Sequence, residues 1–151
     1  IDTVIARLCH IYGPTATLKD NRASSQFINN VINGKDIIMK SDGSQLRSYC
    51  YISDCASGIL TILLNGELAN AYNIANKNSN VTIRQMAEMI ASIAGKKIVF
   101  ELPGDSEKMA YNPVTKSILN SKKLEDLGWH AKIDMKNGLM RTIEILTQLR
   151  E

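Results

Sequence analysis

The sequence lacks the features that would place it in a specialised class of protein. No apolar run reaches the length of about 18 residues that a membrane-spanning helix needs, so no membrane protein is expected. The net charge of +3 is small and the basic residues are scattered, which argues against nucleic acid as a partner. The three cysteines suit neither a disulfide framework nor a zinc site. Reduced, packed cysteines are typical of a cytoplasmic protein.

The sequence also lacks the short motifs that carry nucleotide or covalent chemistry. The nine glycines never form G-x-G-x-x-G or the P-loop pattern, and no G-x-S-x-G is present. The two histidines, His10 and His130, have no nucleophile pattern around them. We therefore assign no catalytic residue and no metal ligand within the chain. It opens in what reads as mid-strand, "IDTVIARLCHIYGP", with no leader sequence, so we expect part of a longer protein.

What is present is an ordinary globular composition, with 44% apolar and 22% charged residues. Apolar runs and helical periodicities alternate along the chain, which predicts an α/β fold in a single domain over 1–151. The strands are expected at 3–8, 37–40, 46–52, 71–76, 97–102 and 117–120, the first of them buried. The helices are expected at 24–34, 53–66, 82–95, 121–129 and 135–149.

Several helix ends carry recognisable signals. Thr82 with Gln85 predicts a capping box, and Gly95 predicts the end of that helix. Ser24 or Ser25 is expected to cap the helix at 24–34. Ser53 or Asp54 is expected to cap the helix at 53–66.

Five sequence pieces, in order, resemble the C-terminal half of the extended short-chain dehydrogenase/reductases, the NAD-dependent nucleotide-sugar epimerases, dehydratases and decarboxylases. The pieces are "R-x-x-x-x-YGP", "DG-x-Q-x-RSY-x-Y-I-x-D", "YNIA", "TI-x-x-x-AE-x-I" and "S-K-K-x-x-x-LGW". They cover the chain from about Val4 to Leu146. The resemblance implies the last core strands of a Rossmann-type fold followed by a small α/β substrate-binding domain.

In this family the N-terminal half carries the glycine-rich NAD loop and a Tyr-x-x-x-Lys pair. Neither occurs here, because no tyrosine of this chain is followed by lysine four positions later. The resemblance therefore implies that the NAD-binding half is absent and that the isolated chain is inactive. It implies NAD as cofactor of the full-length parent only, with the missing Rossmann half as a partner. The parent is expected to be a homodimer.

The most specific prediction from the resemblance concerns Arg47. An arginine in a strand is either a solvated charge or a fork for phosphate. Arg47 matches the family arginine that binds the nucleotide diphosphate. His10 stands where the family usually has asparagine, a residue that reaches the sugar or phosphate. Both are predicted to bind a nucleotide-diphosphate sugar.

The remaining site predictions are weaker. Ser24, Ser25 and Gln26 match the start of a helix whose N-terminus covers the nucleotide, although an ordinary helix cap is the preferred explanation. Lys108 is the nearest cation where the family has a second arginine close to "PGD". Leu8 and Cys9 match positions whose backbone lies against the nicotinamide end of NAD, with side chains expected in the core.

Three alternatives remain open. The chain is the substrate-binding portion of an epimerase or dehydratase, or a stand-alone binding or regulatory module with the same fold, or a generic α/β domain. Asn120 stands where the family usually has aspartate, and the missing second arginine is a further departure. The nucleotide, the sugar and the reaction subtype therefore stay undetermined.

Overall fold

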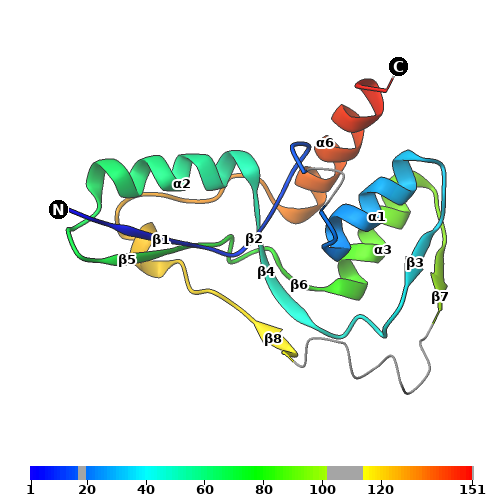
Figure 1. The fold of residues 1–151 in the computed structure, drawn as a ribbon, viewed down its shortest axis with the longest axis horizontal. Coiled ribbons are helices and arrows are strands. Elements are labelled where there is room, and N and C mark those ends of the chain that lie inside the picture. The colour runs from blue at the N-terminus through cyan, green and yellow to red at the C-terminus, as the bar shows by residue number, and fades with distance from the viewer. Residues whose placement is uncertain (17–19, 102–113, 151) are drawn as a thin grey trace.

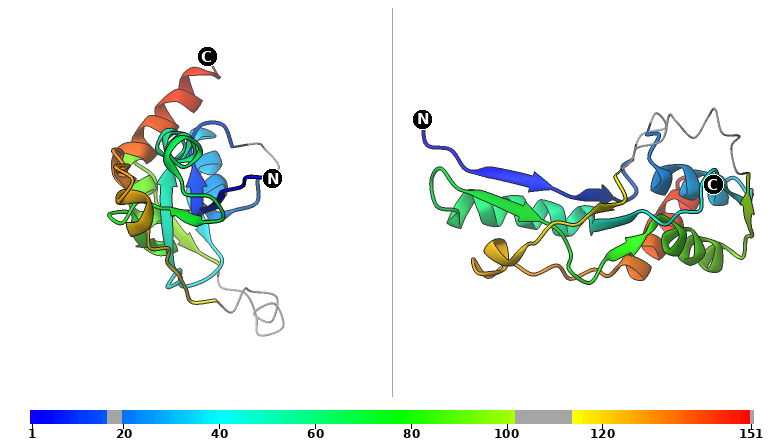
Figure 2. Two further views of the ribbon diagram at one scale, coloured as in Figure 1. Left: turned by 90° about the vertical axis from the view of Figure 1, so that its left-hand side faces the viewer. Right: turned by 90° about the horizontal axis from the view of Figure 1, so that it is seen from below.

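A single six-residue strand, β4 (Leu46–Tyr51), runs through the middle of the molecule. The computed structural model describes residues 1–16, 20–101 and 114–150 (Figure 1). β4 pairs in parallel with β2 (His10–Tyr12) and with β8 (Lys116–Ser117), and antiparallel with β6 (Asn80–Thr82). Two lobes lie on either side of this strand, and the molecule is elongated, as the view from below in Figure 2 shows.

The first lobe, here called the sheet lobe, is built on two parallel strands. β1 (Ile5–Leu8) pairs with β5 (Ala71–Ile74), and the long helix α2 (Ile52–Asn65) lies against them. The short helix α5 (Lys122–Glu125) completes the lobe. Its core contains Cys50, Cys55, Ile62, Tyr72, Ile74, Leu124 and Trp129.

The second lobe, here called the helical lobe, packs three helices beside a two-stranded ribbon. The helices are α1 (Ala23–Ile32), α3 (Ile83–Ala94) and α6 (Met135–Gln148), and the ribbon pairs β3 (Ile37–Met39) with β7 (Ile98–Phe100) in parallel. Their apolar faces meet in a core that includes Tyr12, Phe27, Ile37, Met39, Met86, Ile90 and Leu139. Gly138 is required here, because a Cβ at this position would lie 2.2 Å from the hydroxyl of Tyr12.

Of the three predicted helix caps, one is confirmed and two are wrong. The capping box of Thr82 and Gln85 is confirmed, and Gly95 ends α3 in the left-handed conformation. The other two cap predictions are wrong. α1 begins after Arg22, because the Asp20 carboxylate accepts bonds from the Arg22 N–H and the Ser25 hydroxyl ahead of the predicted start. α2 begins directly after Tyr51, since β4 runs straight into the helix.

Asp54 is buried in the first turn of α2 and performs a different task from the predicted cap. Its carboxylate accepts hydrogen bonds from the backbone N–H groups of Lys132 and Ile133 at 3.0 and 2.8 Å. The Asn76 side chain donates to the Ile133 carbonyl at 2.9 Å. Asp54 and Asn76 therefore fix the segment that leads into α6.

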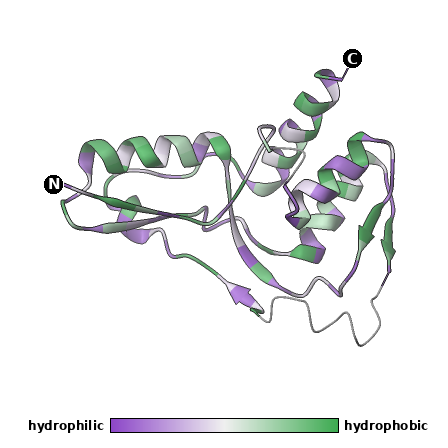
Figure 3. Cartoon of the chain, in the orientation of Figure 1, coloured by the Kyte–Doolittle hydropathy of each residue, from purple (hydrophilic) through white to green (hydrophobic). Residues whose placement is uncertain are grey.

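The first strand has the apolar pattern of a buried strand, but it is exposed in this chain. All four residues of β1 are exposed, because among the described residues this strand has only β5 beside it. Figure 3 shows that hydrophobic residues also run along α2. The exposed apolar side chains of β1 and α2, here called the β1–α2 apolar surface, are Ile5, Leu8, Ile59, Leu60, Leu63 and Leu64.

The prediction of free, packed cysteines is confirmed. All three cysteines are free, Cys50 and Cys55 are buried, and Cys9 is half-buried.

Two short strands, β2 and β6, were not predicted. Each of them pairs with β4, so they depend on a distant partner rather than on their own sequence. Within the described ranges, every helix is too short or too polar to cross a bilayer.

Candidate functional site

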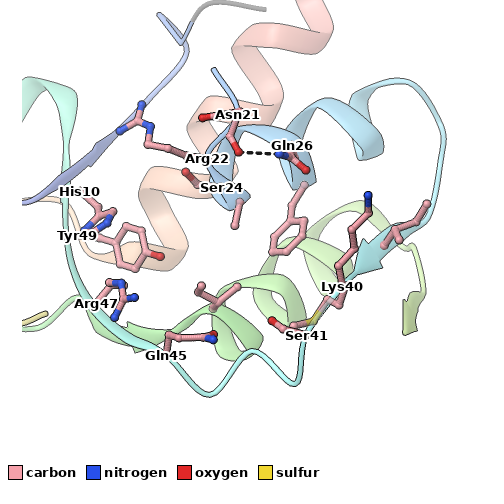
Figure 4. A pocket seen from close by; sticks show the side chains of 15 residues that line it. His10, Asn21, Arg22, Ser24, Gln26, Lys40, Ser41, Gln45, Arg47 and Tyr49 are labelled. Carbon is pink, nitrogen blue, oxygen red and sulfur yellow. Dashed lines mark hydrogen bonds between the residues drawn. The ribbon is translucent and has the colours of Figure 1, made fainter. Parts of the chain in front are cut away.

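A cavity of about 670 Å³ lies where β4 and β2 face the start of α1 and the end of β3 (Figure 4). Its lining carries three cationic side chains, Arg22, Lys40 and Arg47, and no carboxylate among the described residues. A cavity lined by charges of one sign favours an anionic ligand. The other lining residues are His10, Asn21, Ala23, Ser24, Gln26, Phe27, Ile38, Met39, Ser41, Gln45, Tyr49 and Ile83.

Arg47 is held in place by the sheet on both sides. Its neighbours in register are Val81 on β6 and Ser117 on β8. The side chain is only 7% exposed. Its guanidinium donates to the Leu46 carbonyl at 3.0 Å and to the Val114 carbonyl at 2.7 Å. These two bonds orient the guanidinium, which has further N–H donors and lines the cavity.

His10 and Tyr49 form the wall beside Arg47 (Figure 4). They are partners in the β2–β4 register, and their ring centroids are 5.5 Å apart. Burial lowers the pKa of His10, and the nearby positive charges of Arg47 and then Arg22 lower it further. Burial also raises the pKa of Tyr49 to about 12, so its phenol stays neutral at physiological pH. The wall therefore offers one neutral hydroxyl and one titratable imidazole.

The opposite wall is the N-terminus of α1. Arg22 is the residue before the helix, and its guanidinium donates to the Asp20 carboxylate at 2.9 and 3.0 Å and to the Ile11 carbonyl at 2.7 Å. This pairing keeps the pKa of Asp20 well below its usual value. Ser24 is buried in the first turn of the helix, and the Gln26 side chain donates to the Asn21 carbonyl at 2.6 Å. First-turn N–H groups favour an anion at this end of a helix.

The far side of the cavity is apolar. Phe27 on α1, Ile38 and Met39 on β3 and Ile83 on α3 form this part, with Lys40 and Ser41 at its rim. The end beside His10 is thus polar and carries Arg22 and Arg47, whereas the other end suits a flat, weakly polar group and has Lys40 at its rim.

Four of the predicted substrate-binding residues come together in this cavity: Arg47, His10, Ser24 and Gln26. Ser25 does not line it, because its hydroxyl turns to Asp20 at 2.8 Å, beside a second cavity of about 390 Å³ between α1 and α6. Lys108 lies outside the described residues.

The residues predicted to contact the cofactor, Leu8 and Cys9, line neither cavity. Leu8 is 48% exposed, so the expectation that its side chain belongs to the core is wrong. Cys9 is half-buried, and burial raises the pKa of its thiol to about 12. No group of three or more His, Cys, Asp or Glu within the described ranges is arranged to hold a metal ion.

Sequence reasoning missed several lining residues, among them Arg22, Lys40, Gln45 and Tyr49. A signal for Tyr49 was present, because residues two apart in a strand share one face and Arg47 was already predicted to face a ligand. Arg22 and Lys40 lie in segments without strand alternation, and only the packing of the helical lobe brings them to the cavity.

Comparison with known proteins shows what this chain is similar to. Residues 1–75 match the model of the NAD dependent epimerase/dehydratase family. UDP-glucuronic acid decarboxylase 3 of Arabidopsis thaliana is 30% identical over 139 residues, which are 92% of this chain and 39% of the relative. UDP-glucuronic acid decarboxylase 1 of Danio rerio is 26% identical over 150 residues, 98% of this chain and 34% of the relative.

Solved structures show the same fold. UDP-glucose 4-epimerase from Thermotoga maritima, solved with UDP-glucose, has a TM-score of 0.85 at 24% identity and covers all of this chain, which spans 48% of it. UDP-glucuronic acid 4-epimerase from Bacillus cereus, solved with UDP-glucuronic acid and NAD, has a TM-score of 0.80 at 22% identity, with 97% of this chain and 45% of that chain covered. The predicted resemblance and the Rossmann-type α/β class are confirmed, and the chain spans less than half the length of these proteins.

Proposed function

We propose that this chain, which corresponds to one part of an NAD-dependent epimerase/dehydratase, is the nucleotide-sugar-binding portion of such an enzyme. The observation that carries the proposal is the cationic cavity, in which the buried Arg47 guanidinium faces the N-terminus of α1. The ligand is a nucleotide-diphosphate sugar, and its diphosphate lies at the cationic end.

The diphosphate is recognised by charge and by hydrogen-bond geometry. Arg47 presents a planar fork, which suits the paired oxygens of phosphate groups better than a lysine does. Arg22 and Lys40 add positive charge from the other walls. The cavity contributes no lining carboxylate among the described residues, so no fixed negative charge opposes the ligand.

The remaining groups of the ligand find matching surfaces. A nucleobase is flat and only partly polar, and the wall of Phe27, Ile38 and Met39 suits it. The amide side chains of Asn21, Gln26 and Gln45 offer donors and acceptors for hydroxyl groups. The curated relatives named above are UDP-glucuronic acid decarboxylases, so UDP-sugars are the first ligands to test.

The isolated chain is proposed to be inactive. Its sequence has neither the glycine-rich loop nor a tyrosine followed by lysine four positions later. Leu8 and Cys9 line neither of the two cavities, so no step is assigned to NAD in this chain. NAD binding and the chemical step belong to the rest of the parent enzyme.

That missing half is the proposed occupant of the β1–α2 apolar surface. Parallel strands are normally buried with neighbours on both edges, and β1 has one partner strand among the described residues. The side chains of Leu63 and Leu64 are 69% and 77% exposed, which is unusual for a helix in a sheet layer. A Rossmann half that adds a strand beside β1 would cover this surface.

The proposal is tested by calorimetric titration of the 151-residue chain with UDP-glucose, UDP-glucuronic acid, dTDP-glucose, uridine and glucose. We expect binding only for the compounds that contain a diphosphate. Equal binding of uridine, or no binding of any nucleotide sugar, would contradict the proposed site. Product analysis by mass is the second test, and turnover of a nucleotide sugar by the purified chain would refute the proposed inactivity.

A further inference from the structure

His10 occupies an unusual electrostatic position for a titratable side chain. It is half-buried in the cavity wall, with its ring beside Tyr49. From β4 it faces Arg47 and Tyr49, and from the segment before α1 it faces Arg22. The two charged groups that act on the imidazole, Arg47 and Arg22, are both positive. Lys40 lines the same cavity across from His10, at its apolar side.

The nearest candidate for a compensating charge is already engaged. Asp20 is bound to Arg22 through paired hydrogen bonds, and its carboxylate does not line the cavity. In the free chain a proton on His10 would add a further positive charge to this cluster. Accordingly, burial and the charges of Arg47 and Arg22 lower the pKa of His10, with only the Ser48 backbone acting in the opposite direction.

We propose that binding of a nucleotide diphosphate in this cavity is coupled to protonation of His10, so that the chain takes up a proton as it binds. This inference rests on the proposed function, because it requires the diphosphate to lie at the cationic end. The ligand brings two negative charges next to the imidazole and reverses the sign of the local field. Linkage is reciprocal, so a ligand that favours the protonated histidine is itself bound more tightly when that histidine is protonated.

The direction of the pH dependence follows from this linkage. The free-state pKa of His10 lies below its ordinary value of 6.5, and the bound-state pKa lies above the free-state value. Affinity is therefore greatest below the free-state pKa and falls as pH rises through the bound-state pKa. Each unit between the two values is a tenfold change in affinity, and a dianion at close range gives a coupling of about tenfold.

The test is calorimetric titration of the chain with UDP-glucose between pH 5.5 and 8, in two buffers of different ionisation enthalpy. UDP-glucose is chosen because its diphosphate is esterified at both ends and does not titrate in this range. We expect uptake of a fraction of one proton per ligand and an affinity that is higher at pH 5.5 than at pH 8, by up to about tenfold.

Two variants separate His10 from other sources of pH dependence. His10→Asn keeps a polar side chain that cannot become charged, so it should lose both the proton uptake and the pH dependence. His130→Asn removes the one other histidine of the sequence, which is exposed and does not line the cavity. It should retain both properties.

The outcomes distinguish the two proposals. Binding of UDP-glucose with no proton uptake, or with pH dependence unchanged in His10→Asn, would overturn the coupling and leave the nucleotide-sugar site intact. Absence of binding at every pH would overturn both.

Discussion

Replacement of Arg47 by alanine tests the centre of the proposed site. The structure makes Arg47 both a cavity residue and a structural one, because it is 7% exposed and donates to the carbonyls of Leu46 and Val114. Arg47→Ala should therefore weaken ligand binding and also lower stability. A side chain in an open cleft could be removed with little effect on folding, but Arg47 is buried and its loss should affect folding as well.

The size of each effect can be estimated separately. A hydrogen bond from a charged donor contributes about 1.5 to 3 kcal/mol. Loss of the bond to the diphosphate should therefore weaken binding roughly ten- to a hundredfold. Loss of the bond to Val114, at 2.7 Å, leaves a carbonyl without this donor and should cost a similar amount of folding free energy. For a chain of this length that is a fall in Tm of about 5 to 10 °C.

The assay measures both quantities on the same samples. Affinity for UDP-glucose is measured by calorimetry, and unfolding is followed by the fluorescence of Trp129, the only tryptophan, which is buried in the sheet lobe. Arg141→Ala is the matched control, since Arg141 is exposed on α6 and lines neither cavity. Arg47→Lys should recover part of the stability and less of the affinity, because lysine is a point charge without a fork.

Some combinations of affinity and stability would contradict the proposed role of Arg47. An unchanged affinity in Arg47→Ala, at a temperature where the variant is folded, would exclude the diphosphate contact. A large stability loss with little change in affinity for either variant would make Arg47 a purely structural residue that holds Val114. If Arg47→Ala does not fold, Arg47→Lys is the variant that tests the contact. Full affinity for UDP-glucose in Arg47→Lys would contradict the proposal that the guanidinium makes paired hydrogen bonds to the diphosphate.

Three further predictions follow from the packing. Gly138→Ala should destabilise the chain by about 1 to 3 kcal/mol, because the added Cβ would lie 2.2 Å from the hydroxyl and 2.9 Å from the ring Cζ of Tyr12; denaturant unfolding measures this, and an equal loss in a Tyr12→Leu background, where both of these atoms are absent, would contradict the clash. Asp54→Ala should lower the free energy of unfolding by about 2 to 4 kcal/mol, because the backbone N–H groups of Lys132 and Ile133 lose a buried acceptor. Asp126→Ala, which removes an exposed carboxylate, should lower it far less in the same denaturant unfolding measurement. The β1–α2 apolar surface should bind a hydrophobic dye or make the chain self-associate, and a monomeric, dye-silent chain at high concentration would count against it.

The parts of the fold that could be predicted are those with a local cause. The capping box at Thr82 and the glycine at position 95 are determined by residues within one helix, and the structure has both. The two wrong helix starts have a non-local cause. The start of α1 depends on Asp20 upstream, and the start of α2 depends on the strand that runs into it.

Exposure is a property that local sequence predicts less well. The residues of β1 have the apolar pattern of a strand with covered faces, yet all four are exposed. An apolar pattern reports the environment that a strand is suited to, whereas burial depends on which partners are present beside it. The disagreement itself supports the proposal of a missing half that covers β1 and α2.

The candidate site likewise combines residues that a local sequence signal identifies with residues that only tertiary packing brings together. Arg47 was identified from its motif, and Tyr49 could have been added from strand alternation, because both are properties of one strand. Arg22 and Lys40 come from segments on either side of α1, and the pairing of β3 with β7 and the packing of α1 on α3 bring them to one cavity. The combined positive charge is therefore a tertiary property, and it is this charge that makes His10 a proton-linked contact rather than a simple hydrogen-bond donor.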